Sequence, residues 1–316
     1  MPDSRSVLVT GGAGFIGSHL VDALLARGDA VTALDDLSTG RRENVPAAAK
    51  LVVADVRDRA AVARAVEGHD LVFHFGANAD VPTSVRDPDL DFSSNAVGTH
   101  HVLRACIEHR TARVVFASSA AVYGNPLRLP IDEDHPLRPV SPYGASKLAG
   151  EQLGLVYHGV YGLPFTPVRI FNVYGERSRR YVIHDLLRKL GQDARHLEIL
   201  GDGMQRRDFC HVDDAVAILL GIADRGSLAG RTINLCAGSP LTIRALAEEI
   251  VAALGLEGVT KMTFTGASWQ GDINMLLGDP SRMRSELGYT PRVTLREGIA
   301  RVAAWLTRVD GWRPAL

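Results

Sequence analysis

Cysteine is scarce in this chain of 316 residues, which has three such residues, Cys106, Cys210 and Cys236. They lie far apart and form no Cys-x-x-Cys pair, which disfavours both a disulfide framework and a zinc site and indicates free thiols in a reducing compartment. Apolar runs are short as well, since none approaches the about 18 residues of a membrane span. No apolar signal region precedes the first predicted strand. We therefore expect a cytoplasmic protein that has no membrane partner.

An excess of charge of either sign is also missing. The chain carries 35 lysines and arginines against 36 aspartates and glutamates, so no basic field argues for a nucleic-acid partner. Hydrophobic residues make up 46% of the chain, enough to bury a sizeable core in one large domain or in two. His184, His196 and His211 are not spaced as a set of metal ligands, and we predict no bound metal.

Glycine, in contrast, is concentrated directly after the first predicted strand. Residues 7–10 are β-formers, residues 11–17 read Gly-Gly-Ala-Gly-Phe-Ile-Gly, and a helical pattern runs from about Gly14 to Leu25. A strand, a glycine turn and a helix N-terminus in this order form a pyrophosphate site, because backbone N–H groups and the helix dipole point at the anion. Glycines alone are a weak signal, but this context predicts a dinucleotide site.

A carboxylate at the end of the second predicted strand completes this fingerprint. Residues 30–34 are apolar, and Asp35 follows them, 18 residues beyond Gly17. A carboxylate is expected about 20 residues on, where it binds the adenosine ribose diol. Because it repels a 2′-phosphate, the sequence favours NAD over NADP, although Arg41 and Arg42 keep NADP open.

Further strands and helices alternate up to about residue 170. This pattern is typical of a doubly wound parallel sheet, the Rossmann type of α/β fold. We expect strands at residues 50–55, 70–75, 112–117 and 163–170, and helices at residues 59–66, at 90–109 and from 143 onward.

The pattern loosens after Tyr174. Residues 197–203 and 261–264 are short candidate strands among helices, and residues 232–235 fit either the main sheet or this region. We interpret residues 1–174 as an NAD-binding Rossmann domain to which some later segments return. Residues 175–316 then form mainly a smaller C-terminal α/β substrate-binding lobe.

Tyr143 and Lys147 are four residues apart, so on a helix they share one face. A phenol has a pKa of about 10, and a neighbouring ammonium group lowers it by stabilising the phenolate. Such a tyrosine can take or give a hydroxyl proton. Ser118 and Ser119 end the preceding strand at the edge where ligands bind, so either one can donate a hydrogen bond to the reacting group.

Three longer segments complete the pattern. They read His-Phe-Gly-Ala at 74–77, Arg-Ile-Phe-Asn-Val-Tyr-Gly at 169–175 and Gly-Asp-Gly-Met-Gln-Arg-Arg-Asp-Phe-Cys-His-Val-Asp at 201–213. Together with the glycine turn and the Ser-Tyr-Lys set, they resemble the extended short-chain dehydrogenase/reductase family over nearly the whole chain. The similarity is greatest to its UDP-glucose 4-epimerase branch.

The resemblance implies NAD as cofactor, a nucleotide-diphosphate sugar as substrate and a homodimer. It implies catalytic roles for Ser119, Tyr143 and Lys147. The implied cofactor contacts are Gly11, Gly14, Phe15, Ile16, Gly17, Asp35, Asp36, Leu37, Ser38, Thr39, Gly40, Asp55, Val56, Phe75, Gly76, Ala77, Asn95, Ser118, Tyr143, Lys147 and Phe171. The candidate substrate contacts are Ser119, Tyr143, Asn172, Arg179, Arg207 and Asp272.

Two departures from the family pattern concern the substrate. The family's Arg-x-Gly-Asp reads Trp-Gln-Gly-Asp at residues 269–272, so an arginine on the diphosphate is missing or comes from elsewhere. The stretch after Gly175 lacks the usual proline and is basic. An arginine there, for which we take Arg179, can replace that clamp or bind a carboxylate on a uronate; a solvated basic loop is the alternative.

The residues after Ser119 bear on the reaction. Family members that are 4,6-dehydratases show Thr-Asp-Glu here and decarboxylases Thr-Ser-Glu, whereas this chain has Ala120 and Ala121. We therefore expect epimerisation at C4 of a nucleotide-diphosphate hexose through a transient 4-keto sugar. The alternatives are a UDP-glucuronate 4-epimerase or decarboxylase, another oxidoreductase of the family, and a non-catalytic NAD-binding sensor.

Overall fold

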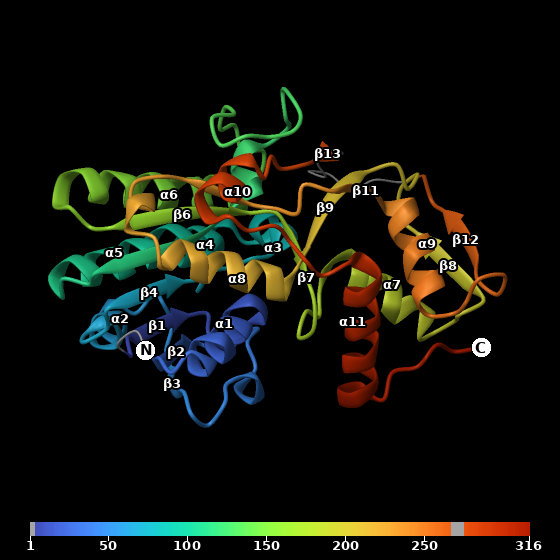
Figure 1. Ribbon diagram of the computed structural model, residues 1–316, viewed down its shortest axis with the longest axis horizontal. Coiled ribbons are helices and arrows are strands. Elements are labelled where there is room, and N and C mark those ends of the chain that lie inside the picture. The colour runs from blue at the N-terminus through green and yellow to red at the C-terminus, as the bar shows by residue number, and fades with distance from the viewer. Residues whose placement is uncertain (1–3, 267–274) are drawn as a thin grey trace.

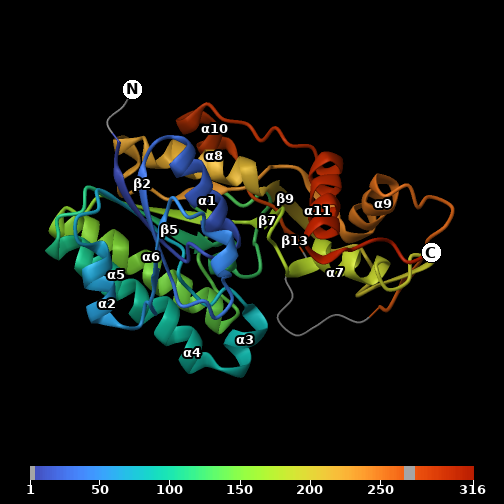
Figure 2. The same ribbon diagram turned by 90° about the horizontal axis from the view of Figure 1, so that it is seen from below.

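A seven-stranded parallel sheet forms the larger part of the computed structural model, which describes residues 4–266 and 275–316 (Figures 1 and 2). Its strand order is β10-β6-β5-β4-β1-β2-β3, with the change of direction beside β1 that marks a doubly wound sheet. The strands are β1 Ser6–Thr10, β2 Ala30–Asp35, β3 Lys50–Val53, β4 Leu71–His74, β5 Arg113–Ser119, β6 Phe165–Ile170 and β10 Ile233–Leu235. The predicted Rossmann-type fold is confirmed.

Helices cover both faces of this sheet (Figure 2). Strand β1 shows why, because Val7 and Val9 pack into one apolar cluster and Leu8 packs into another. The first cluster includes residues of α1 Phe15–Ala26 and α8 Val212–Ala223, and the second those of α2 Arg59–Val66, α5 Gly98–Glu108 and α6 Pro142–Tyr161. Since successive side chains of a strand point to opposite faces, a continuous apolar strand requires this double cover.

The predicted helix over residues 90–109 is interrupted. The structure has α3 Val81–Arg86, then α4 Pro88–Phe92, a π-helical segment at Ser93–Val97 and then α5. The apolar pattern continues through the π segment, so the sequence alone does not show it. Helix α6, in contrast, begins where its signals predict: Ser141 caps it by accepting from the Gly144 N–H at 3.1 Å, and Pro142 follows.

A smaller lobe stands beside the carboxyl edge of the large sheet (Figure 1). One of its sheets pairs β9 Arg206–His211 with β7 Asn172–Tyr174, β11 Pro240–Thr242 and β13 Met275–Leu276. A second pairs β8 His196–Ile199 with β12 Lys261–Phe264. Its helices are α7 Tyr181–Leu190, α9 Ile243–Ala253 and α11 Leu295–Asp310, and their apolar faces share one core.

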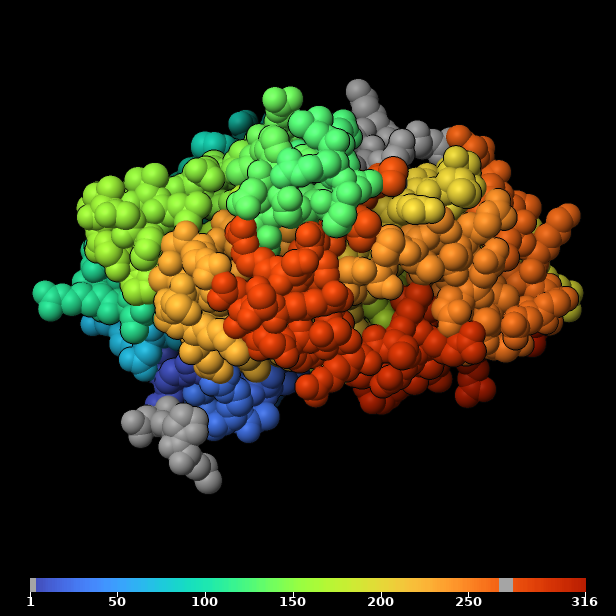
Figure 3. Space-filling view, turned by 45° about the horizontal axis from the view of Figure 1, so that its top comes forward, coloured from blue at the N-terminus to red at the C-terminus, as the bar shows by residue number. Residues whose placement is uncertain are grey.

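Late segments of the chain return to the large sheet. Strand β10 pairs with β6, which assigns residues 232–235 to the main sheet, and α10 Ser281–Leu287 packs near it. The loop after β5 is also held by the late chain, because the Ile131 N–H donates to the Leu277 carbonyl at 2.8 Å. Figure 3 shows the loop after β5 (green) and the late chain (red) in contact on the surface. In the ranges 4–266 and 275–316, no helix has the length and apolar character needed to cross a bilayer.

Candidate active site

A cavity of about 960 Å³ lies where the carboxyl ends of the large sheet's strands face the smaller lobe. Its lining takes residues from five strand ends or the turns after them: Gly11, Asp35, Phe75, Ser119 and Phe171. In open α/β sheets, ligands bind at this edge. The volume lies at the upper end of the usual range for ligand sites.

The glycine turn brings backbone close to backbone at one end of this cavity. Gly11 has φ +70°, and a Cβ there would lie 2.7 Å from the Phe75 carbonyl carbon, so a side chain is excluded. No side chain of the described residues caps the start of α1 at Gly14. The N–H groups of the first turn therefore face the cavity and suit an anion.

Asp35 is tied to both sides of its own loop. Its Oδ2 accepts from the Ala13 N–H at 3.0 Å and its Oδ1 from the Leu37 N–H at 2.9 Å. Burial raises the pKa of the Asp35 carboxyl, and these two hydrogen bonds oppose that rise. A Cβ at Gly40 would lie 2.6 Å from Asp35 Oδ1, so the loop wraps closely around the carboxylate.

A buried hydrogen-bond relay sets the floor beside the glycine turn. Thr10 Oγ1 is 2.7 Å from His74 Nδ1, His74 Nε2 is 3.0 Å from Thr99 Oγ1, and the Thr99 hydroxyl donates to the Asn95 carbonyl at 2.5 Å. Thr10 Oγ1 also accepts from the Gly76 N–H at 3.0 Å. Burial, aided by the charge of Lys147, lowers the pKa of His74 to about 3, so the ring stays neutral. Thr10 and Thr99 were not identified from the sequence, where single threonines carry no signal.

Tyr143 and Lys147 lie in the first two turns of α6 and both line the cavity. Burial lowers the pKa of Lys147 to about 8, and its Nζ donates to the Ala117 carbonyl at 2.9 Å. Burial raises the pKa of the Tyr143 phenol, and a hydrogen bond with Ser119 opposes that rise. Lys147 is not among the groups that shift the pKa of this phenol in the protein itself, so the lowering that we expected from the spacing is not found there.

The structure distinguishes the two candidate serines. The Ser118 hydroxyl donates to Glu151 Oε2 at 2.6 Å, and the Glu151 carboxylate pairs with the buried guanidinium of Arg169. This hydroxyl is therefore engaged inside the protein, although Ser118 also lines the cavity. Ser119 is the one that bonds Tyr143, which fits the catalytic role that the resemblance implies for it.

The opposite wall belongs to the smaller lobe and carries the candidate substrate residues. Asn172 on β7 and Arg207 on β9 both line the cavity. Arg179 lines it too, but its guanidinium pairs with Asp310 at 2.8 and 2.9 Å and lies over the Trp305 ring at 5.1 Å.

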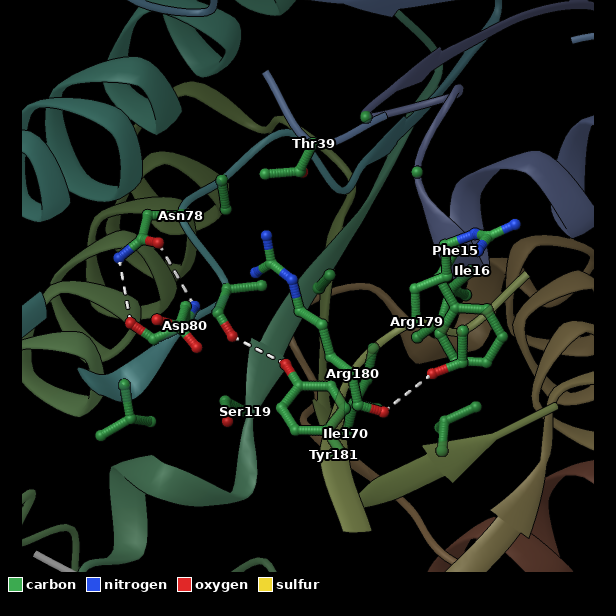
Figure 4. A pocket seen from close by; sticks show the side chains of 18 of the residues that line it. Phe15, Ile16, Thr39, Asn78, Asp80, Ser119, Ile170, Arg179, Arg180 and Tyr181 are labelled. Carbon is green, nitrogen blue, oxygen red and sulfur yellow. Dashed lines mark hydrogen bonds between the residues drawn. The ribbon is translucent and has the colours of Figure 1, made fainter. Parts of the chain in front are cut away.

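Arg180, which the sequence did not single out, instead crosses the middle of the cavity (Figure 4). No hydrogen bond or ion pair to another described residue engages its guanidinium.

Comparisons with known proteins agree with this geometry. The family model described as "NAD dependent epimerase/dehydratase family" matches residues 7–236. The chain belongs to this family.

Relatives of two activities are similar to the chain. A putative UDP-glucose 4-epimerase of Methanocaldococcus jannaschii is 36% identical over 95% of this chain and 98% of its own. A dTDP-glucose 4,6-dehydratase of Streptomyces niveus is 33% identical over 97% and 94%. The crystal structure of Thermus thermophilus UDP-glucose 4-epimerase in complex with NAD superposes with a TM-score of 0.86 at 33% identity, covering 96% of this chain and 99% of that one. The cofactor of the family is NAD, and the protein is an epimerase or dehydratase of nucleotide-diphosphate sugars.

The residues of this chain fit that cofactor. The uncapped start of α1 suits the pyrophosphate, and the Asp35 carboxylate at the end of β2 suits the ribose diol. The predicted cofactor residues that line the cavity are Gly11, Gly14, Phe15, Ile16, Gly17, Asp35, Asp36, Ser38, Thr39, Asp55, Val56, Phe75, Gly76, Ala77, Ser118, Tyr143, Lys147 and Phe171.

Three predicted cofactor residues lie outside this lining. Leu37, at φ +61°, and Gly40 shape the loop around Asp35. Asn95 is buried behind the wall, where its Nδ2 is 3.0 Å from the Asn78 carbonyl, so it supports the loop after β4. The predicted substrate residue Asp272 falls outside the described residues.

Proposed function

We propose that the protein interconverts the C4 epimers of a nucleotide-diphosphate hexose of the UDP-glucose/UDP-galactose type through a 4-keto intermediate. The observation that carries this proposal is the Ser119, Tyr143 and Lys147 set, followed by the methyl side chains of Ala120 and Ala121. Hydride transfer at C4 needs one proton shuttle, and this set supplies one. Elimination of water needs a further acid and base, which these alanines lack.

The cavity's other carboxylates do not replace the missing acid and base. Asp35 accepts from backbone, Asp55 pairs with Arg57 at 2.6 Å, and Asp80 caps α3 through the Thr83 N–H at 2.9 Å. Among the described residues, the other two lining carboxylates are engaged as well, Asp36 by Ser38 and Asp185 by Arg188. These contacts support epimerisation over the elimination chemistry of a dehydratase.

The side chains divide the proton chemistry among them. Tyr143, as the phenolate, accepts the O4 proton when the hydroxyl is oxidised and returns it after the sugar has turned over, while Ser119 holds O4 by a hydrogen bond. The buried Lys147 ammonium, which lines the same cavity, supplies a positive charge that favours this phenolate against the effect of burial. NAD, when bound, accepts a hydride from C4 and gives it back. Contacts to the nucleotide hold the intermediate in the site, because remote binding energy substitutes for the few contacts of the ketone.

Arg207 and Arg180 are the cations that we propose for the substrate's diphosphate. Both line the cavity on the smaller lobe. The guanidinium of Arg180 pairs with no other described residue, whereas that of Arg179 is held by Asp310 and Trp305. Arg180 therefore also supports a second candidate, a UDP-glucuronate 4-epimerase, in which it would bind the carboxylate of the sugar in bidentate fashion.

We further propose that two copies of the chain associate through α6. Among the apolar side chains of the neighbouring helix α5, Val102 and Leu103 are fully buried in the chain's own core. Val156 and Val160 on α6, in contrast, are 56% and 66% exposed, and Phe92 on the neighbouring α4 is 57% exposed. Exposed apolar side chains on α6 and on a helix beside it are typical of an interface.

One experiment tests the activity. Purified protein is incubated with UDP-glucose, UDP-N-acetylglucosamine, UDP-glucuronate and dTDP-glucose, and the products are identified by NMR. We expect the C4 epimer of the hexose substrate and no net consumption of NAD. A 4-keto-6-deoxy sugar or a pentose product would contradict the proposal.

A further inference from the structure

Tyr181 is the first residue of α7, and its backbone is in an unfavourable conformation. Its φ is +70°, in the left-handed region that glycine favours and bulky residues avoid. Strain of this kind persists where the surrounding structure enforces it, and it is concentrated at ligand clamps and active sites. A glycine would meet the backbone requirement of this turn without strain, so the aromatic side chain calls for another explanation.

The phenol of Tyr181 crosses from one lobe to the other. Its hydroxyl donates to the carbonyl of Ala79 at 2.8 Å, a residue 102 positions earlier in the chain. Figure 4 shows the ring between the smaller lobe and the loop that carries Asn78 and Asp80. That loop directly follows Phe75, Gly76 and Ala77, which line the cavity on the cofactor side.

The same loop is held from behind by the buried side chain of Asn95, whose Nδ2 is 3.0 Å from the Asn78 carbonyl. Two adjacent residues of the loop are thus held from opposite sides. The Asn78 carbonyl accepts from Asn95 inside the protein, and the Ala79 carbonyl accepts from Tyr181 across the cavity. It fixes the position of the ring as well as that of the loop.

The ring also lies within electrostatic reach of the reacting groups. Tyr181 lines the same cavity as Ser119 and Tyr143, and its side chain is among the groups that raise the pKa of the Tyr143 phenol, after burial. Even so, 58% of the Tyr181 surface remains exposed, so this lining residue is accessible to a ligand in the cavity.

We propose that Tyr181 determines substrate specificity by forming one wall of the sugar subsite. Held by Ala79 in the same cavity as the Ser119 and Tyr143 side chains, the ring limits the room around the hexose and disfavours sugars that carry a bulky acyl substituent. This inference rests on the proposed function, since it concerns which nucleotide sugar that activity accepts.

Two variants separate the ring from its hydroxyl. Tyr181→Gly removes the ring and suits a φ of +70°, so we expect its melting temperature to equal or exceed that of the wild type. Tyr181→Phe keeps the ring and loses only the bond to Ala79. Tyr161→Phe is the matched control, because Tyr161 is an exposed phenol outside the cavity lining. Tyr181→Asn is the second variant should the glycine variant fail to fold, since asparagine tolerates left-handed backbone.

The readout is the ratio of kcat/KM for UDP-N-acetylglucosamine to that for UDP-glucose, together with the dissociation constants of both by calorimetry. In Tyr181→Gly we expect both ratios to shift about tenfold toward the acylated sugar, which is the usual scale for added room in a subsite. In Tyr181→Phe we expect a smaller shift and faster hydrogen exchange at residues 78–81, and in Tyr161→Phe no change. A shift below threefold in Tyr181→Gly, or a shift toward UDP-glucose, overturns the inference.

Failure of the proposed function would look different. In that case the wild type would epimerise none of the nucleotide sugars. The calorimetric comparison of wild type with Tyr181→Gly would still test the subsite, because binding does not require turnover.

Discussion

Lys147 carries a charge that the fold buries almost completely, and this makes a signed prediction possible. Burial lowers its pKa from 10.5 to about 8. Between these pH values the unfolded chain holds the proton and the folded chain does not, so this group's contribution to stability rises with pH across the window. At neutral pH the buried charge costs up to about 3 kcal/mol, since one pKa unit corresponds to about 1.4 kcal/mol.

Lys147→Met should therefore raise the free energy of unfolding at pH 7 while reducing kcat at least about 100-fold. After the lost bond to Ala117 we expect a net gain of roughly 1–2 kcal/mol, since a carbonyl left without its donor costs about 1 kcal/mol or more. The gain should vanish above pH 10.5, the pKa of the unfolded chain. Urea unfolding of both proteins at pH 7 and near pH 10.5 measures it. A Lys147→Met variant that is less stable than the wild type at pH 7 would show that interactions in the fold offset the cost of burying the Lys147 charge.

Tyr143→Phe isolates the proton transfer from binding. The hydroxyl is the group that takes and returns the O4 proton, so we expect kcat to fall by about 10²–10⁴-fold. NAD binding should change little, because the ring still fills its place. Turnover by NMR and cofactor affinity by fluorescence are the two measurements. A variant that keeps more than a tenth of the wild-type kcat would exclude Tyr143 as the main proton shuttle.

At this scale the sequence identifies residue types better than individual residues. The Tyr-x-x-x-Lys spacing and the glycine turn could be read directly, because each follows from local geometry. The motif comparison already points to Ser119, but the hydrogen bond that engages Ser118 comes from Glu151, 33 positions away, and the ion pair that holds Arg179 comes from Asp310, 131 positions away. No local pattern encodes such distant partners.

Among the elements, the loop after β7 joins three parts of the molecule through one residue, Glu176. Glu176 accepts from Arg301 Nε of α11 at 3.0 Å and lies 3.3 Å from His211 Nε2 at the start of α8, while its carbonyl is 2.9 Å from His19 Nε2 of α1. Burial opposes ionisation, but the interactions with His211 and Arg301 lower the pKa of Glu176 to about 2.

Glu176→Gln should weaken this junction in a pH-dependent way. The folded-state pKa lies below the ordinary value of 4.5, so the stabilisation is present above pH 4.5 and is lost as the pH falls toward 2. Because the side chain is partly exposed, we expect a loss of roughly 1–2 kcal/mol at pH 7. Denaturant unfolding should show that the difference in free energy of unfolding between wild type and Glu176→Gln is smaller at pH 3 than at pH 7. The control is Glu67→Gln, since Glu67 is exposed. An equal difference at both pH values would rule out the ionised carboxylate as its cause.

The predicted elements of the large sheet agree with the structure to within a few residues, because their apolar runs are long and bounded by glycine or aspartate. The strands β7, β11 and β13 were not predicted. They have two or three residues each and show no alternation of their own, and they exist because β9 offers them partners. The π-helical segment at Ser93–Val97 was not predicted either, because it changes the hydrogen bonding of the helix and leaves its apolar pattern intact.

At the scale of the whole molecule, the two lobes share the chain rather than dividing it. Strand β10 and helices α8 and α10 come late in the sequence and complete the large sheet and its cover, so the site between the lobes is built from both halves of the chain. The interpretation of residues 1–174 and 175–316 as two parts therefore describes where most of each lobe comes from. It also explains why no linker is visible in the sequence.

The proposed association through α6 is the property of the whole molecule that is simplest to test. Val160→Glu places a charge among the exposed apolar side chains of α6, where burial in an interface would cost several kcal/mol. We expect sedimentation velocity to show a dimer for the wild type and a monomer for the variant at micromolar concentration. Val309→Glu is the matched control, because this valine is 47% exposed on α11 of the other lobe. If Val160→Glu sediments as the wild type does, α6 is not the interface, and the exposed valines need another partner.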